Sequence, residues 1–300
     1  RDLDDLDEEE DGDEDATLAG DLRHGFRLLG DDECEAMQPP PYIVKGLLGE
    51  RQVGAIVGAP GAGKSLLAPY LAHHVARGAE CFGRKTKPGP VLYIAAEDDS
   101  GMVMRRRALR MYHGDAPDLH LVVGVHDLLS KEQHTKDGQL GRLRALVKEM
   151  KPRLVIIDTL AAAFPALEEN DSAGMGTVVK AARLLARRGP CVLMVAHDAK
   201  AGGGLVRGHS SINGDLDVSL ALTKADDGTV TARATKNRNG PLEAAIAFRV
   251  GVAAVAEDED GDPYTAAYCE PVDPERAGEA TGVLTGQALK AWKLFQQMAA

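Results

Sequence analysis

The stretch that decides the fold is Gly58-Ala59-Pro60-Gly61-Ala62-Gly63-Lys64-Ser65. It matches the G-x-x-x-x-G-K-[ST] phosphate loop at every fixed position. Residues 52–57 before it predict a short buried strand, and the apolar residues 66–75 after it predict a helix. The motif requires this strand–loop–helix context, which makes a chance glycine-rich turn a poor alternative. The sequence therefore predicts that the chain binds a nucleoside triphosphate.

Each residue type in the loop has a chemical reason. The glycines let backbone N–H groups turn toward a phosphate at the positive end of the following helix. Lys64 can reach the β- and γ-phosphates, and the Ser65 hydroxyl can ligate Mg²⁺. We therefore take all of residues 58–65 as binding residues, with ATP and Mg²⁺ as the cofactors.

The negative charge of the chain is concentrated at its start. The formal net charge is −11, but residues 1–15 hold eleven acids and one base, so the rest carries only about −1. A near-neutral core lacks the basic surface of a general nucleic-acid binder. The four cysteines have no zinc-site spacing, and no apolar run reaches the length of a membrane span. We expect reduced thiols and a cytoplasmic protein with no membrane partner.

The order of apolar runs predicts an α/β fold. Continuous apolar strands alternate with helices, which indicates a mainly parallel twisted sheet covered by helices on both faces. The predicted parallel strands are 53–57, 91–96, 119–123, 154–157 and 191–196, and the helices between them include 102–112, 140–150 and 175–188. Antiparallel strands at 218–223, 229–234, 244–250 and 264–269 extend the sheet on its C-terminal side.

This pattern divides the chain into five segments. We expect a disordered acidic tail (1–17), a lead-in (18–50), the ATPase core (51–270), a linker (271–282) and a helix (283–300) that could begin a small C-terminal domain.

Two carboxylates end predicted strands near the phosphate loop. Asp158 follows residues 154–157, where a second Mg²⁺-side carboxylate belongs, although a strand-end acid without this role is the alternative. Glu97 follows residues 91–96 and could polarise the water that attacks the γ-phosphate. Nucleotide kinases instead position a substrate hydroxyl and carry an arginine-rich lid. Most of the arginines after Glu97 are expected to lie in solvent, so hydrolysis is favoured over phosphotransfer. Those arginines are Arg105, Arg106, Arg107 and Arg110.

Three further residues are candidates for sensing or stabilising charge. His197 ends the last predicted parallel strand and could sense nucleotide cleavage, or it could be a structural histidine of the sheet edge. Lys236 and Arg238 lie two apart and could neutralise transition-state charge at a neighbouring subunit's nucleotide. Solvated surface charge is the alternative for this pair.

Together these motifs resemble the RecA-like ATPase superfamily. The closest resemblance is to ring-forming replicative helicases of the RepA and DnaB types and to related "AAA family" ATPases of bacteria and phages. It covers about residues 42–250. The matching segments are 44–48, the phosphate loop, 93–98, 156–160 as Walker B, 196–200 as the sensor, 207–211, and the K-x-R-N-G-P segment at 236–241.

The resemblance implies a role for each of these candidates. Glu97 would be the catalytic base, and Lys236 and Arg238 would act in trans within an oligomer, most simply a hexameric ring. The loops 161–174 and 199–211 would face a central channel and hold single-stranded DNA, with Lys200 and Arg207 as the contacting cations. The first loop has no Lys or Arg, and its one aromatic residue is Phe164.

Three functions remain open on the sequence. The leading one is a DNA-stimulated ATPase motor, a RepA-like helicase or replication protein. The second is a RecA-like regulatory or loader ATPase without unwinding activity. The third is a DNA-binding adaptor whose terminal helix begins a winged-helix module and whose ATP site is structural.

Overall fold

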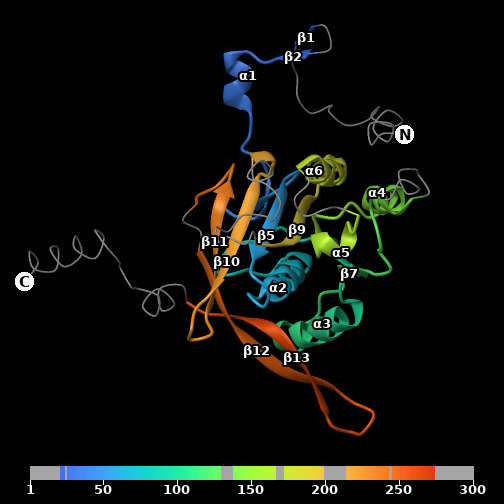
Figure 1. Ribbon diagram of the computed structural model, residues 1–300. Coiled ribbons are helices and arrows are strands. Elements are labelled where there is room, and N and C mark those ends of the chain that lie inside the picture. The colour runs from blue at the N-terminus through green and yellow to red at the C-terminus, as the bar shows by residue number, and fades with distance from the viewer. Residues whose placement is uncertain are drawn as a thin grey trace, which may run out of the picture.

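A nine-stranded sheet forms the centre of the molecule, as the computed structural model shows (Figure 1). The structure describes residues 21–23, 26–129, 138–166, 172–198, 214–242 and 245–273. The strands follow the order β13-β12-β11-β10-β5-β9-β8-β6-β7. The predicted acidic tail and the predicted C-terminal helix lie outside the described residues. The α/β architecture, mostly parallel with antiparallel strands at the C-terminal side, confirms the fold class and is consistent with a RecA-like core.

The six strands from β10 to β7 run parallel to one another. Because parallel neighbours need a crossover between them, the helices cover both faces of this half of the sheet. The sequence predicts five of these strands as parallel and groups residues 218–223 with the antiparallel strands. That strand is β10, and it runs parallel to β5 and antiparallel to β11. The predicted boundaries hold to within about two residues. The parallel strands are β5 (Val53–Gly58), β6 (Val91–Ala95), β7 (Leu119–Val122), β8 (Leu154–Asp158), β9 (Cys191–His197) and β10 (Val218–Lys224).

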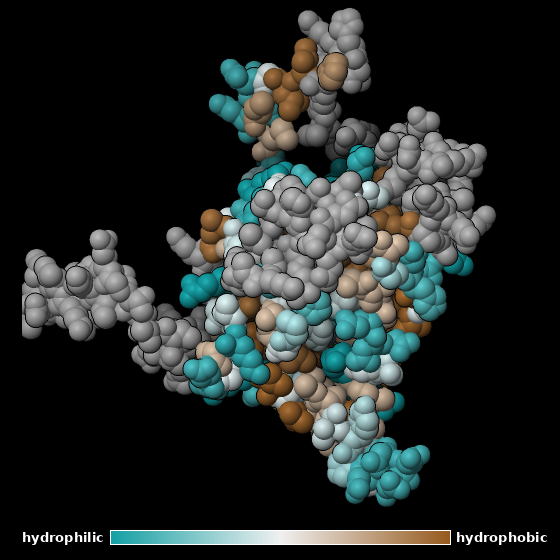
Figure 2. Space-filling model, viewed as in Figure 1, coloured by the Kyte–Doolittle hydropathy of each residue, from teal (hydrophilic) through white to brown (hydrophobic). Residues whose placement is uncertain are grey.

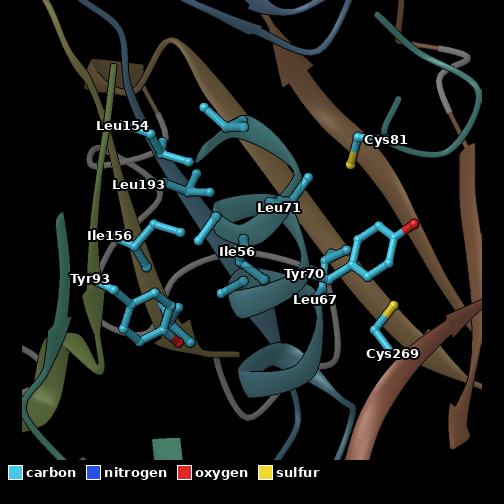
Figure 3. Packing of buried hydrophobic residues seen from close by; sticks show 14 of the residues in the cluster. Ile56, Leu67, Tyr70, Leu71, Cys81, Tyr93, Leu154, Ile156, Leu193 and Cys269 are labelled. Carbon is cyan, nitrogen blue, oxygen red and sulfur yellow. The ribbon is translucent and has the colours of Figure 1, made fainter. Parts of the chain in front are cut away.

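Alternate residues of these strands enter two separate hydrophobic clusters. One cluster packs Ile56 and Ile156 against α2 (Lys64–Arg77) and α3 (Asp99–His113), and Figure 3 shows α2 lying across these side chains. The other cluster takes the opposite faces of the same strands. It packs them against α4 (Gln139–Met150), α5 (Leu160–Ala163) and α6 (Ser172–Ala186). The continuous apolar runs in the sequence follow from burial on both sides.

The antiparallel half of the sheet ends in a long hairpin. β11 (Val230–Asn237) leads to β12 (Ala245–Glu257) and β13 (Pro263–Pro271), and β12 continues well past residue 250, where the sequence pattern ends it. The hairpin packs against α3, where the rings of Tyr112 and Tyr268 stack at a centroid distance of 4.3 Å. Figure 2 shows its hydrophilic tip at the bottom of the molecule. The contact with α3 is one that the alternation of polar and apolar residues within β12 and β13 does not predict.

The lead-in contributes to the core. β3 (Tyr42–Val44) and β4 (Leu48–Gly49) form a small hairpin, and Ile43 and Leu48 are fully or almost fully buried in the α2 cluster. Before it come three short elements that the sequence pattern does not predict: β1 (Asp21–Arg23), β2 (Phe26–Leu28) and α1 (Asp31–Ala36). Across the described part of the chain, no helix combines the length and the apolar character needed to cross a bilayer.

Candidate nucleoside triphosphate site

The phosphate loop joins the end of β5 to the start of α2. Gly61 has a φ of +74° and Gly63 a φ of +93°, a left-handed conformation that glycine adopts without strain. Gly63 is the N-cap of α2. The ammonium group of Lys64 donates to the carbonyl oxygens of Gly58 and Ala59 at 2.9 and 3.0 Å. The loop therefore curls around a nearly buried cation at the positive end of a helix, which is the arrangement that binds phosphate groups.

Three parallel strands bring further predicted residues to the same edge. Asp158 ends β8, His197 ends β9, and Glu97 follows the end of β6 by two residues. The Ser65 hydroxyl donates to Oδ1 of Asp158 at 3.4 Å, and Nδ1 of His197 lies 3.4 Å from Nζ of Lys64. The structure therefore brings together most of the predicted phosphate-site residues from four separate segments.

A pocket of about 110 Å³ opens beside Ser65. Its lining is mainly polar and carries more acidic than basic groups. The lining residues are Ser65, Tyr93, Ala95, Glu97, Asp98, Met102, Arg105 and Asp158. Mg²⁺ in phosphate sites is held by one or two carboxylates together with the substrate's phosphates and water. A serine hydroxyl next to one strand-end carboxylate fits that ion.

Asp158 has a partner that the sequence analysis missed. The phenol of Tyr93 donates to Oδ2 of Asp158 at 2.5 Å, and both side chains are buried. Burial raises the pKa of Asp158, the charge of Glu97 raises it further, and the hydrogen bonds from Tyr93 and Ser65 oppose the rise. Tyr93 leaves one carboxylate oxygen directed at Ser65 and so orients the group. The available signal was a tyrosine in an otherwise aliphatic strand.

Arg105 is a second residue of the pocket that the sequence did not identify. Most of the arginines after Glu97 were expected to lie in solvent, but Arg105 lines the pocket and its side chain is only 27 % exposed. Its Nη2 lies 3.3 Å from Oδ2 of Asp98, whose Oδ1 accepts the N–H of Gly101 at the start of α3. Because Asp98 and Arg105 are seven residues apart, two helical turns bring them to one face. That spacing was the signal for the contact.

Lys236 and Arg238 lie at the other edge of the sheet. Asn237, between them, pairs with Val218 of β10, and Val218 pairs with Gly54 of β5. Gly58 is four residues further along β5, about 13 Å at about 3.3 Å per residue. Within one chain, the structure therefore does not bring the two cations to the phosphate loop.

The two residues predicted to contact DNA remain untested. Lys200 and Arg207 lie outside the described residues. Phe164 is described, and it is 2 % exposed in the cluster under α5 and α6. A ring buried in the core offers no face for a base, so the one aromatic residue of the first loop is not a stacking platform.

The chain matches a known protein family. A family model described as an AAA domain matches residues 22–203, which is more than half of the chain. The matched range contains the phosphate loop, Glu97, Asp158 and His197, and it ends before Lys236 and Arg238. The strand–loop–helix phosphate site on a mostly parallel sheet agrees with this match. The chain belongs to the AAA domain family of P-loop-related ATPases.

Proposed function

We propose that this chain is an ATP-hydrolysing RecA-like motor of the RepA and DnaB kind. It acts as a hexameric ring on single-stranded DNA. The observation that carries the hydrolytic part is the pocket lined by Ser65, Glu97 and Asp158, of which Ser65 directly follows Lys64 in the phosphate loop. These are the groups that binding a triphosphate and activating a water molecule require.

Each group has one task in this proposal. The loop N–H groups and Lys64 bind the phosphates, and Lys64 neutralises charge on the β- and γ-phosphates. Ser65 and Asp158 hold Mg²⁺, which supplies further charge neutralisation when it is bound. Glu97 is exposed at the pocket, where it can orient and deprotonate the attacking water. His197, in contact with Lys64, reports on the state of the γ-phosphate.

The position of Lys236 and Arg238 supports action in trans. They lie at the sheet edge opposite their own phosphate loop, so they are available to a neighbouring subunit's nucleotide. This geometry, together with the K-x-R-N-G-P segment, supports a ring in which each site lies between two subunits. A cation supplied from a neighbour stabilises the charge of the transferring phosphoryl group.

A loader or regulatory ATPase is the second candidate function. The near-neutral charge of the chain after residue 15 and the burial of Phe164 favour it, because both weaken the case for a DNA channel. In this alternative the same hydrolytic cycle controls assembly of other proteins, without strand separation.

The first experiment tests hydrolysis. Glu97→Gln is expected to lower kcat about 10²- to 10⁴-fold with ATP affinity retained, because it removes only the base. Lys64→Ala is expected to abolish ATP binding. Asp99→Asn, an exposed acid two residues from Glu97, is the matched control and is expected to keep turnover. Wild-type turnover in Glu97→Gln would refute the assignment of the base.

The second experiment tests action in trans by mixing subunits. Arg238→Ala is expected to lose turnover but to retain ATP binding. Adding Lys64→Ala subunits, which carry an intact Arg238, is expected to restore some turnover at mixed interfaces. If no mixing ratio restores turnover, the shared site is refuted.

The third experiment separates the motor from the loader. ATP turnover is measured with and without single-stranded DNA on a sample of measured mass, together with strand separation. A hexamer whose turnover rises with DNA and which separates strands is the expected result. A hexamer that shows neither effect supports the loader.

A further inference from the structure

A buried carboxylate joins three elements at the sheet edge opposite the phosphate loop. Asp217 immediately precedes β10, and its side chain is only 7 % exposed. Its Oδ2 accepts the backbone N–H of Val53 at 2.9 Å and a hydrogen bond from Arg183 of α6. Its Oδ1 lies 3.3 Å from Nη1 of Arg238. One carboxylate thus contacts the first residue of β5, the last part of α6 and the residue after β11.

Backbone hydrogen bonds hold this carboxylate in place. The N–H of Asp217 donates to the carbonyl of Val53 at 2.8 Å, and the N–H of Arg238 donates to the carbonyl of Asp217 at 2.8 Å. Burial alone would raise the pKa of Asp217. The hydrogen bonds from Arg183 and Val53 and the charges of Arg183 and Arg238 outweigh it, so the pKa lies below its usual range. The group is therefore ionised at neutral pH, as an anchor for arginine requires.

Arg238 is held through its guanidinium, and its side chain is otherwise largely exposed. Its guanidinium meets Asp217 through Nη1, yet the side chain as a whole is 56 % exposed. The neighbouring residues are also tied down: Nδ2 of Asn237 donates to the carbonyl of Gly46 at 3.1 Å, and Nζ of Lys236 donates to the carbonyl of Gly214 at 2.6 Å. A guanidinium that is held through one of its nitrogens, on a side chain that is more than half exposed, suits presentation to a neighbouring molecule.

We propose that Asp217 is a positioning residue, which orients Arg238 for the triphosphate of the adjacent subunit. The inference rests on the proposed function, because it needs a site shared between subunits. Asp217 acts through Arg238 and does not touch the nucleotide. Through its contacts with Val53 and Arg238, Asp217 links the guanidinium of Arg238 to β5, the strand that ends in the subunit's own phosphate loop.

The loss of kcat expected in an Asp217 variant can be estimated from the value of an arginine supplied in trans. An arginine supplied in trans is worth about 10³- to 10⁵-fold in kcat, and displacing a positioned group by about 1 Å can cost about 10²-fold. Asp217→Asn keeps the size of the side chain and removes the charge that holds Arg238. We expect kcat to fall about 10- to 100-fold, with the affinity for ATP unchanged.

Arg183→Gln is the matched control variant. It removes the other arginine from the same carboxylate, and it lowers stability without releasing Arg238. We expect it to lower Tm and to keep most of the turnover. An equal loss of turnover in Arg183→Gln and Asp217→Asn would overturn the proposal in favour of a structural role.

The decisive readout is rescue in trans. Lys64→Ala subunits carry an intact Asp217 and Arg238, so mixing them with Asp217→Asn subunits is expected to restore turnover at the Asp217→Asn sites. A defect confined to the fold or to the variant's own ATP site is not rescued in this way. In the Arg238→Ala background, Asp217→Asn is expected to add no further loss of kcat.

The outcomes separate this inference from the proposed function. A wild-type chain without ATP turnover, or an Arg238→Ala variant with full turnover, would refute the proposed function. Loss of turnover in Arg238→Ala, with normal or raised turnover in Asp217→Asn, would refute the role of Asp217 alone. A loss that mixing fails to rescue would refute it as well.

Discussion

Replacing Gly63 by alanine perturbs the phosphate loop at its most constrained position. Gly63 has a φ of +93°, and an added Cβ would lie 3.1 Å from Cζ and 3.2 Å from Cε2 of Phe248. Phe248 is fully buried in β12, so its ring has little room to move. The left-handed backbone costs alanine about 1–2 kcal/mol, and overpacking a rigid core adds about 1–3 kcal/mol.

Gly61 supplies the matched control. Its φ is +74°, but a Cβ there would meet nothing within 4 Å. Gly61→Ala should therefore cost only the backbone strain of about 1–2 kcal/mol. The difference between the two variants isolates the contact with Phe248. We expect Gly63→Ala to lower the free energy of unfolding by at least about 1 kcal/mol more than Gly61→Ala does.

Urea unfolding of both variants measures this difference, and ATP titration shows whether the loop keeps its shape. Phe248→Leu should cost less in the Gly63→Ala background than in the wild type, because the smaller side chain relieves the clash; the coupling expected for residues in contact is at least about 0.5 kcal/mol. Equal destabilisation by Gly61→Ala and Gly63→Ala, with no coupling to Phe248, would refute the close packing of Phe248 against Gly63.

Two further predictions concern the pocket cation and a histidine cluster. Arg105→Gln should lower kcat/KM for ATP about tenfold, about 1.4 kcal/mol, because it removes the cation that lines the pocket. Arg107→Gln, at an exposed position, should change kcat/KM little. Steady-state kinetics of both variants tests this prediction. His73 and His74 are buried in α2, and burial lowers their pKa values to about 3 and about 4. Because unfolded histidine binds a proton below about pH 6.5, the free energy of unfolding should fall as pH drops from 6.5, by up to about 2 kcal/mol per histidine at pH 5. Unfolding curves at pH 7 and pH 5 test this, with His73→Gln expected to weaken the dependence and the exposed His126→Gln expected to leave it unchanged.

The elements that flank the phosphate loop could be predicted from the sequence. The strand before the loop and the helix after it agree with β5 and α2 to within about two residues, because each is specified by its own apolar residues. The meeting of Asp158 with Ser65 was also predictable, since parallel strands bring their carboxyl ends to one edge. The DNA contacts at Lys200 and Arg207 remain predictions, as do the segment boundaries.

Other features could not be read from local patterns. β12 runs to Glu257 because β13 pairs with it as far as Pro263, and alternation within one strand does not reveal how far its partner extends. The sequence did not separate Arg105 from the other arginines of its helix, although it lines the pocket and pairs with Asp98 there. Phe164 was considered as a loop aromatic, yet it is buried in the cluster of α5 and α6. In each case the environment is supplied by residues from another segment.

The sequence by itself determined the chemistry of the phosphate loop and the class of fold. Both depend on short-range properties, namely glycines that permit a left-handed backbone and apolar runs that require burial. Only the tertiary structure decided the partners of the charged and polar groups. Tyr93 reaches Asp158 across 65 residues of chain, and Asp217 reaches Val53 across 164. Such contacts form only after the sheet has assembled, because the order of its strands, and not their sequence, sets which side chains become neighbours.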